Sequence, residues 1–427
     1  MLFRSRQALD QALPATAVSA EDARALGLMR ADVAAATTDA PLLSAGAGSE
    51  QGCATARSAQ GEPALVASLY DCFATFGNHI DFEGRRYSRT GALALLHELP
   101  EASRRETLFR AFAPLWSAVH DGRDSPYQRL LAEIVAHRGA DGDRIDAAAR
   151  TVGADRHAVE QWLRQALEAW SKATDTGTLT EPWDYWYRHT AATRAVDALL
   201  PPDRVPRVAD RFLRDLGADL ASMQVLEDLN VRPGKAPLAY TDYIRIGRHT
   251  ARGWQPARVR VSANLDKGGL YVANELIHED GHAVHMMALR TRPAFFDLGD
   301  AVYYEALADV PAWSVAAPDF QRRYLGTVLD RGPSNEALFA GVALDLAWGL
   351  FELQMLDHPD TDPNELWAAL TERYLHIRPH PELSWWALRV QLVHVPGYMI
   401  NYALGAVITA DLREQIVEEI GPFDAGN

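Results

Sequence analysis

The chain has 427 residues, of which 48% are hydrophobic and 23% are charged, as in an ordinary globular protein. This length is enough to bury a large core. The 42 basic and 57 acidic residues give a net charge of −15, which repels phosphate backbones and anionic lipid surfaces. We therefore expect neither nucleic acid nor a membrane as a partner.

The cysteines and the amino-terminal sequence bear on the cellular compartment. Cys53 and Cys72 cannot build a disulfide framework, and neither has metal-ligand spacing. Such scarcity is typical of a reducing compartment. The first residues lead into polar sequence without the apolar stretch of a secretory signal. These features predict a cytoplasmic protein and leave its oligomeric state unknown.

The first 63 residues differ in composition from the rest of the chain. Residues 1–35 have helical composition, whereas residues 37–63 are rich in Ala, Ser, Gly, Thr and Gln. We expect residues 1–63 to form a helical segment followed by a flexible linker. Residues 64–235 show repeated helical periods broken at Pro and Gly, which predicts the helices of a first lobe.

The hydrophobic period changes shortly before the most informative motif. Residues 258–264 alternate polar and apolar side chains, which predicts a half-exposed strand of a small sheet. A turn at residues 266–269 then leads into a predicted helix.

This helix contains the sequence H-E-D-G-H at residues 278–282, a match to H-E-x-x-H. His278 and His282 are about one helical turn apart, so both imidazoles project from one face toward a single point. Glu279 lies at the edge of that face, where its carboxylate can act on a water molecule without binding a metal. The pattern is typical of zinc peptidases, although it also arises by chance on amphipathic helices.

A catalytic zinc takes three protein ligands and keeps one position open, so a third ligand must exist. One class of enzymes places it at the sixth residue after the second histidine, and Ala288 at that position excludes the class. The other common choice is a glutamate from a following helix, which Glu305 offers. Asp309, one turn later, is placed to accept a hydrogen bond from a liganding histidine. Pro311 is expected to kink or end this helix.

His285 lies on roughly the same face as the two histidines of the motif. It could act as a substitute ligand, as a hydrogen-bonding neighbour of the ligands, or as a packing residue. A fourth protein ligand would leave no position for water. We therefore favour a neighbouring or packing role for His285.

We expect the remaining residues, 236–427, to form the half of the protein that holds the metal. Residues 337–356 are apolar enough to suggest a membrane span, but Asp345 and Glu352 lie within them. We interpret this segment as a buried helix. Further helical periods lie on either side of it.

A second candidate segment lies near the end of the chain. Attack on a peptide carbonyl develops negative charge on its oxygen, and a neutral donor stabilises that charge. Tyr398 and Tyr402 share a helix face, and His394 precedes a Pro-Gly turn. Tyr402 is our preferred donor. On pattern alone, such residues near apolar helices are more often packing residues.

At these residues the sequence resembles the gluzincin zinc metallopeptidases. H-E-x-G-H-x-x-H is similar to the thimet oligopeptidase and oligopeptidase F family, and E-A-L-A-D at residues 305–309 resembles a motif of the angiotensin-converting-enzyme family. The resemblance implies Zn2+ held by His278, His282 and Glu305, with Glu279 as the general base. It also implies a histidine followed by tyrosines as oxyanion donors and substrate binders.

The same resemblance implies a mainly α fold, with two helical lobes around a deep central cleft and a small β-sheet next to the zinc helix. An edge strand of that sheet would pair with an extended peptide, although a purely structural hairpin is equally compatible. We expect residues 64–427 to form this domain and to hydrolyse oligopeptides. Asp280 departs from the family pattern by adding a negative charge beside the base.

Two alternatives to the peptidase remain open. One is a catalytically degenerate peptidase fold that serves as a binding or scaffold protein. The other is a zinc hydrolase that acts on a small peptide-like metabolite.

Overall fold

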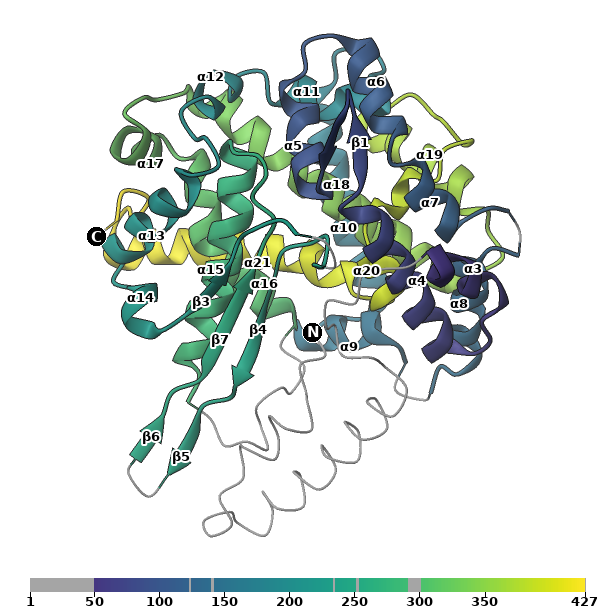
Figure 1. Cartoon of the computed structure of the whole chain (residues 1–427), viewed down its shortest axis with the longest axis horizontal. Helices are drawn as coiled ribbons and strands as arrows, with labels where there is room; N and C mark the ends of the chain where they lie inside the picture. The colour runs from purple at the N-terminus through teal and green to yellow at the C-terminus, as the bar shows by residue number, and fades with distance from the viewer. Residues whose placement is uncertain are drawn as a thin grey trace.

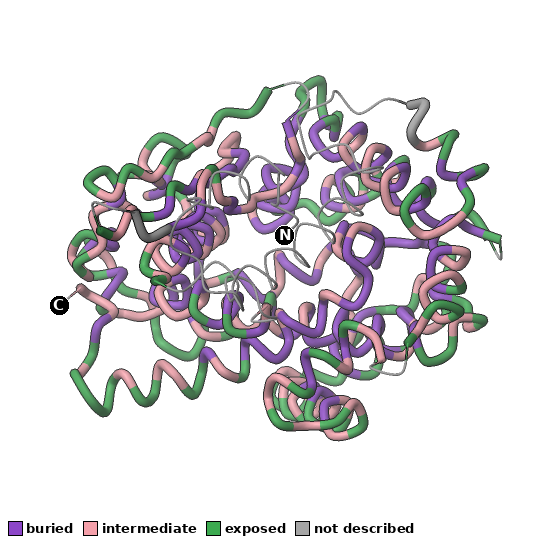
Figure 2. The backbone as a smooth tube through the Cα atoms, turned by 90° about the horizontal axis from the view of Figure 1, so that it is seen from below, coloured by how far each residue is buried: buried purple, intermediate pink, exposed green. Residues whose placement is uncertain are grey.

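The computed structural model describes residues 50–122, 124–139, 142–232, 235–250, 253–290 and 301–426. This part of the chain is mainly helical with small sheets, as the sequence predicted (Figure 1). Buried segments gather inside the body, and exposed segments lie on its outside (Figure 2). The predictions for residues 1–49 fall outside the described residues.

The described chain begins with α3 (Glu50–Ser58) and α4 (Glu62–Gly77). A disulfide joins Cys53 to Cys72, and the Arg129 guanidinium donates hydrogen bonds to three carbonyl oxygens at the end of α3. The prediction of a linker is therefore wrong for residues 50–58, because contacts that composition does not reveal hold them in a helix. Disulfides persist in oxidising environments, so cysteine usage no longer supports the cytoplasmic location, which stays a prediction.

Short helices build most of the first half of the chain. Polar side chains mark several of their starts, since Ser88, Ser125 and Asp155 each accept a backbone N–H in the first turn. The antiparallel strands β1 (Ile80–Phe82) and β2 (Arg85–Tyr87) precede them. The helices are α5 (Arg89–Glu98), α6 (Ala102–Arg110), α7 (Ala113–Val119), α8 (Pro126–Ala136), α9 (Arg144–Thr151), α10 (Arg156–Thr174), η1 (Pro182–Asp184), α11 (Tyr185–His189), α12 (Arg194–Asp197), α13 (Val205–Asp215) and α14 (Leu220–Met223).

A three-stranded sheet packs against the helix that carries H-E-x-x-H. Its order is β3-β7-β4, with β3 parallel and β4 antiparallel to the central strand. Val259 and Val261 are fully buried, so the predicted alternating strand is confirmed. A two-stranded ribbon, β5 with β6, projects from the body (Figure 1). The elements are β3 (Leu226–Asp228), β4 (Tyr240–Arg245), β5 (Arg248–Thr250), β6 (Gly253–Gln255), β7 (Arg258–Ser262) and α15 (Leu270–Ala288).

Helices make up the second half, and three of them pack together: α15 on α16, and α16 on α21. A Cβ on Gly281 of α15 would lie 2.9 Å from Ala308 O of α16, so the glycine permits this close approach. The α16 helix ends one residue after Pro311, as predicted. The elements are α16 (Ala301–Ala312), η3 (Trp313–Ala316), α17 (Pro318–Phe320), η4 (Gln321–Leu325), α18 (Arg331–Asp357), α19 (Pro363–Leu375), η5 (Trp385–Leu388), α20 (Gln391–His394) and α21 (Met399–Ile420).

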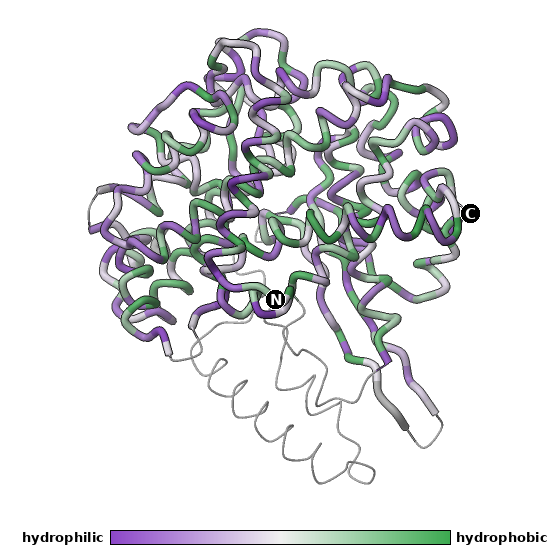
Figure 3. Tube along the Cα trace, turned by 180° about the vertical axis from the view of Figure 1, so that it is seen from behind, coloured by the Kyte–Doolittle hydropathy of each residue, from purple (hydrophilic) through white to green (hydrophobic). Residues whose placement is uncertain are grey.

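Buried apolar residues of the described chain form two main clusters. The larger cluster unites helices between α4 and α10 with α18, α19 and α21, whereas the smaller one unites α13, the sheet, α15 and the segment after α16. Hydrophobic and hydrophilic residues alternate along many helices, so one face of each can join a core (Figure 3). The predicted division of the chain at residue 235 stays a prediction.

The α18 helix is the segment that composition alone could mistake for a membrane span. Among the described residues it is the one helix long and apolar enough to cross a membrane, and 67% of its most apolar window is buried in the protein. This burial agrees with the prediction of a core helix at residues 337–356.

Candidate active site

Three side chains from two helices converge at the centre of the site. His278 and His282 lie on α15, and Glu305 lies on α16. Glu305 Oε2 is 3.3 Å from His278 Nε2 and 3.6 Å from His282 Nε2. Atoms bonded to a tetrahedral zinc at about 2.1 Å lie about 3.4 Å from one another. Both distances therefore fit a single zinc ion, and all three donor atoms lie within 4.8 Å of one another.

The charges of the cluster also fit a cation. Glu305 Oε2 is buried without a hydrogen-bond partner in the described chain. Burial lowers the pKa of His278, but the carboxylates of Asp309 and Glu305 outweigh it and raise that pKa well above its usual value. The site thus favours positive charge between these side chains. Two imidazoles and one carboxylate are a donor set that catalytic zinc takes.

Asp309 holds one of the two histidines in place. Its Oδ1 lies 2.7 Å from His278 Nδ1, one helical turn after Glu305 on α16. A hydrogen bond at Nδ1 fixes the imidazole so that Nε2 faces the cluster. The geometry that the sequence predicted for Asp309 is present, with His278 as its partner.

Glu279 is buried beside the cluster and lines a cavity next to it. Thr241 of β4 donates a hydrogen bond to Glu279 Oε2 at 2.8 Å. Burial raises the pKa of the Glu279 carboxyl above its ordinary value, which brings it closer to the range of an effective proton acceptor near neutral pH. The sheet therefore positions the candidate base.

The two tyrosines at the start of α21 have different partners. Tyr398 OH donates a hydrogen bond to Glu305 Oε1 at 2.6 Å. Tyr402 OH accepts one from Gln391 Nε2 at 3.2 Å, and Tyr402 lines the cavity. Because Gln391 uses a lone pair of the Tyr402 oxygen, the Tyr402 proton is free for another acceptor. Tyr402 is thus placed to donate into the cavity, whereas Tyr398 orients Glu305.

A buried carboxylate fixes the turn before α21. Glu352 of α18 accepts hydrogen bonds from the backbone N–H groups of Gly397 at 2.6 Å and Met399 at 2.8 Å. Burial raises the pKa of Glu352 to about 8, although these two bonds favour its ionised form. Gly397 has a φ of +84°, which glycine adopts without strain. The positions of the two tyrosines therefore depend on a residue of the core.

The structure does not bring His394 and His285 into the cluster. The His394 ring lies 4.5 Å from the ring of Tyr70 of α4, and His394 is not among the described residues that line the cavity. Burial lowers its pKa to about 3, so it is a neutral packed side chain. The predicted oxyanion role of His394 lacks support because α20 packs against α4. The His285 ring lies 4.6 Å from the ring of Tyr304, which matches the packing alternative.

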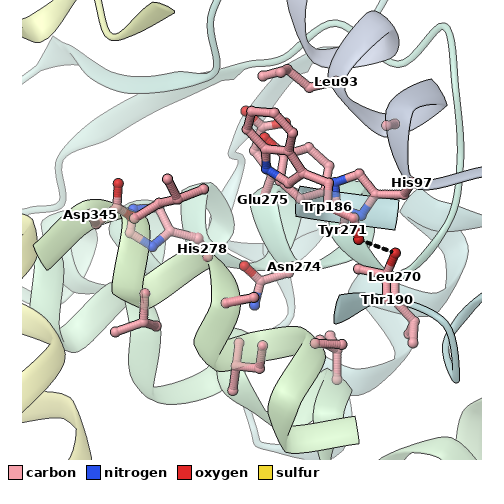
Figure 4. A pocket seen from close by; sticks show the side chains of 18 of the residues that line it. Leu93, His97, Trp186, Thr190, Leu270, Tyr271, Asn274, Glu275, His278 and Asp345 are labelled. Carbon is pink, nitrogen blue, oxygen red and sulfur yellow. Dashed lines mark hydrogen bonds between the residues drawn. The ribbon is translucent and has the colours of Figure 1, made fainter. Parts of the chain in front are cut away.

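A cavity of about 260 Å³ continues from the cluster along the N-terminal half of α15. The side chains of His278, Glu275 and Tyr271 lie along this cavity (Figure 4). Trp186 and His97 lie near Tyr271, and the His97 and Tyr271 rings are 5.0 Å apart.

Four residues of the site were missed by the sequence analysis: Thr241, Gln391, Arg89 and Arg389. The contact between Thr241 and Glu279 spans 38 residues, and no local pattern predicts such a pairing. Arg89 and Arg389 also reach the cavity from outside any motif. Of the four, Gln391 could have been found, because this polar residue lies three residues before His394.

No protein-family model and no curated protein matches this sequence. Among solved structures, PZ peptidase A, determined with an inhibitor, matches with a TM-score of 0.56 and 12% sequence identity over 86% of this chain and 70% of that chain. A putative oligoendopeptidase F gives 0.47, with 16% identity over 84% of this chain and 66% of its own. A putative oligoendopeptidase F from Bacillus anthracis gives 0.44, with 13% identity over 98% and 75%. The chain therefore has a fold similar to that of PZ peptidase A.

Proposed function

We propose that the protein is a zinc-dependent peptidase that hydrolyses peptide bonds of oligopeptides. The observation that carries this proposal is the convergence of His278 Nε2, His282 Nε2 and Glu305 Oε2 beside the Glu279 carboxylate. Three protein ligands leave zinc an open position, as a catalytic site requires. The shared fold of PZ peptidase A, a peptidase by name, supports the same conclusion.

Each residue of the site has a role in this proposal. Bound zinc supplies a Lewis acid, which lowers the pKa of water and polarises a carbonyl group. Glu279 accepts the proton of the attacking water and passes it to the leaving amine. Tyr402 donates a hydrogen bond to the carbonyl oxygen as its negative charge grows. Asp309 and Tyr398 hold His278 and Glu305 in position.

The edge of the sheet supports an extended peptide as the substrate. Among the described strands β4 ends the three-stranded sheet, and Thr241 in β4 contacts Glu279. Main-chain groups at such an edge can pair with an extended chain. A peptide bound there would lie next to the base, and a cavity of about 260 Å³ has no room for a folded protein.

Metal content and peptide cleavage test the proposal together. The wild type and the Glu279→Gln variant are loaded with zinc, dialysed, assayed for metal and incubated with a mixed pool of oligopeptides. We expect about one zinc per chain in both proteins, because Glu279 is not a ligand. Turnover should fall by about a thousandfold or more in the variant, because proton transfer contributes about 10² to 10⁴ to the rate.

A matched control replaces a glutamate outside the site. Glu106 of α6 forms an exposed ion pair with Arg110, and Glu106→Gln should keep both zinc and turnover. Absence of zinc from the wild type would contradict the proposal and favour a scaffold protein. Zinc without cleavage of any peptide would instead favour a hydrolase for a small metabolite.

A further inference from the structure

The cavity extends well beyond the cluster along one face of α15. Glu275 and Tyr271 lie about one and two helical turns before His278, and all three side chains line the cavity (Figure 4). From Tyr271 to His278 the helix rises about 10 Å. An extended peptide covers this distance with about three residues. The cavity is therefore long enough for the last few residues on one side of a scissile bond.

A buried arginine with unused donors faces this space. Arg89 of α5 is 8% exposed and lines the cavity. Within the described chain Arg89 forms no ion pair, and its guanidinium hydrogen-bonds through Nε to Pro237 O at 3.2 Å. The N–H groups of Nη1 and Nη2 have no acceptor within the described chain, and a guanidinium stays charged. Because a buried cation that pairs with no carboxylate at close range is costly, an anion is the expected occupant.

A second guanidinium, that of Arg389, lines the same cavity. Arg389 pairs with Asp345, and its guanidinium carbon lies 5.7 Å from the centre of the Tyr402 ring. Burial lowers the pKa of Arg389, and the charge of Arg89 lowers it further against the opposing effect of Tyr402. The two guanidinium groups therefore repel one another, and Arg389 is also close to the candidate oxyanion donor Tyr402.

Glu275 is near both arginines but forms an ion pair with neither in the described chain, and Arg389 is paired with Asp345 instead. Glu275 Oε1 accepts a long hydrogen bond of 3.4 Å from Thr90. Burial raises the pKa of Glu275, although the charges of Arg89 and Arg389 oppose this shift. The cavity thus offers the free guanidinium donors of Arg89 beside a carboxyl group that burial tends to neutralise.

We propose that Arg89, supported by Arg389, binds a carboxylate of the substrate within two or three residues of the scissile bond. This inference rests on the proposed peptidase function and defines its substrate class as short peptides with a terminal or side-chain carboxylate at that distance. Two parallel N–H···O bonds from one guanidinium match a carboxylate in geometry and charge. The fixed position of Arg89 relative to the cluster then selects which peptide bond meets Glu279.

Binding to the zinc-loaded Glu279→Gln protein tests this carboxylate site without turnover. Calorimetry compares three acetylated tripeptides of small apolar residues: a free acid, the corresponding amide, and an amide that carries one glutamate side chain. We expect at least one carboxylate-bearing peptide to bind about tenfold or more tightly than the neutral amide. Tighter binding of the free acid identifies the chain terminus as the source, and tighter binding of the glutamyl amide identifies the side chain.

Further substitutions in the Glu279→Gln protein show which residues cause the preference for carboxylate-bearing peptides. Adding Arg89→Gln should abolish it, whereas Arg89→Lys should retain part of it because the charge remains. Glu275→Gln should strengthen carboxylate binding severalfold, since it removes a negative neighbour. The control Arg86→Gln removes an arginine whose side chain is 59% exposed and paired with Asp81, and it should change nothing. Thermal unfolding of each variant verifies that it folds.

The outcomes separate this inference from the function on which it rests. Equal affinity for all three peptides overturns the carboxylate site, and so does a preference that survives in a folded Arg89→Gln variant. If the site binds carboxylates but the zinc-loaded wild type cleaves no peptide, the peptidase proposal fails and the carboxylate site stands. If the wild type cleaves acid and amide peptides equally well, the peptidase stands and the substrate class is wrong.

Discussion

The hydroxyl groups of Tyr398 and Tyr402 contact different partners, although the sequence placed both on one helix face. Tyr398 donates to Glu305, which is a candidate zinc ligand, whereas Tyr402 accepts from Gln391 and keeps its own proton available. A hydrogen bond to a ligand affects how tightly a metal is held. A donor aimed at the reacting oxygen affects the rate of the chemical step. The two tyrosines should therefore differ in what their loss changes.

Removing each hydroxyl group in turn tests this division. Tyr402→Phe should lower kcat about 100-fold with little change in KM, because the lost donor acts on developing charge. Tyr398→Phe should weaken zinc binding about tenfold, with a smaller effect on kcat once zinc is saturating. Steady-state kinetics at saturating zinc and competition with a chelator measure the two effects. Tyr303→Phe, at a 39% exposed position on α16, is the control. An unchanged kcat in Tyr402→Phe would contradict the assignment.

How much of the site the sequence could predict depends on how far apart the contacting residues lie. His278 and His282 share one turn of one helix, so their convergence follows from helical geometry alone. The prediction of Glu305 also required the rule that a catalytic zinc takes a third protein ligand. Thr241 and Arg89 contact the site from β4 and α5, and neither periodicity nor spacing encodes such long-range contacts.

Among the elements, the crossing of α15 and α16 decides whether the donor atoms can meet. Gly281 lies between the two histidines of the motif, at the point where a Cβ would be 2.9 Å from Ala308 O and 3.0 Å from Ala308 Cα. Both atoms are backbone, which moves less easily than the end of a side chain. The glycine therefore determines how closely the helix with His278 approaches the helix with Glu305.

Gly281→Ala should force these helices apart. We expect a loss of about 1 to 3 kcal/mol in the free energy of unfolding, as for overpacking in a core. Zinc affinity should fall as well, because Glu305 moves away from both imidazoles. Denaturant unfolding and chelator competition measure the two effects. Gly341→Ala in α18 is the matched control: a Cβ there meets nothing within 4 Å, so the variant should be slightly stabilised. Equal stability of the two variants would refute this account.

Local signals predicted some elements and missed others for physical reasons. The strand at residues 258–262 was visible because the buried Val259 and Val261 alternate with the more exposed Arg258 and Arg260, and Pro311 marked the end of α16. The helix at residues 50–58 was not visible, because its sequence has few large apolar side chains. A disulfide and the hydrogen bonds of Arg129 hold it instead.

In the whole molecule, the site lies where the two apolar clusters meet. Leu276 and Ile277 of α15 belong to the smaller cluster, whereas Val302 of α16 and Leu404 of α21 belong to the larger one. Tyr304 and Ala312 of α16 belong to the smaller cluster as well, so the helix that carries Glu305 joins both cores. A change in how these cores pack would alter the spacing of the donor atoms, which couples metal binding to the integrity of the whole fold.

The disulfide between Cys53 and Cys72 affects the stability of the whole molecule and does not contact the site. Cross-linking residues 19 apart restricts the unfolded chain, and a loop of that size contributes about 3 kcal/mol in the chain-entropy model. Reduction should therefore shift urea unfolding to a lower midpoint. Zinc binding and peptide cleavage without urea should remain, because α3 packs on α4 rather than on α15, α16 or α21.

Urea unfolding with and without dithiothreitol, monitored by tryptophan fluorescence, measures the shift of the midpoint. A variant with Cys53→Ser and Cys72→Ala is the control: it should unfold near the midpoint of the reduced wild type and should not respond to the reductant. An oxidised and a reduced wild type with the same midpoint would show that the cross-link contributes nothing to folding. A large difference would mean that this protein reaches its full stability only in an oxidising compartment, against the cytoplasmic location that the sequence predicted.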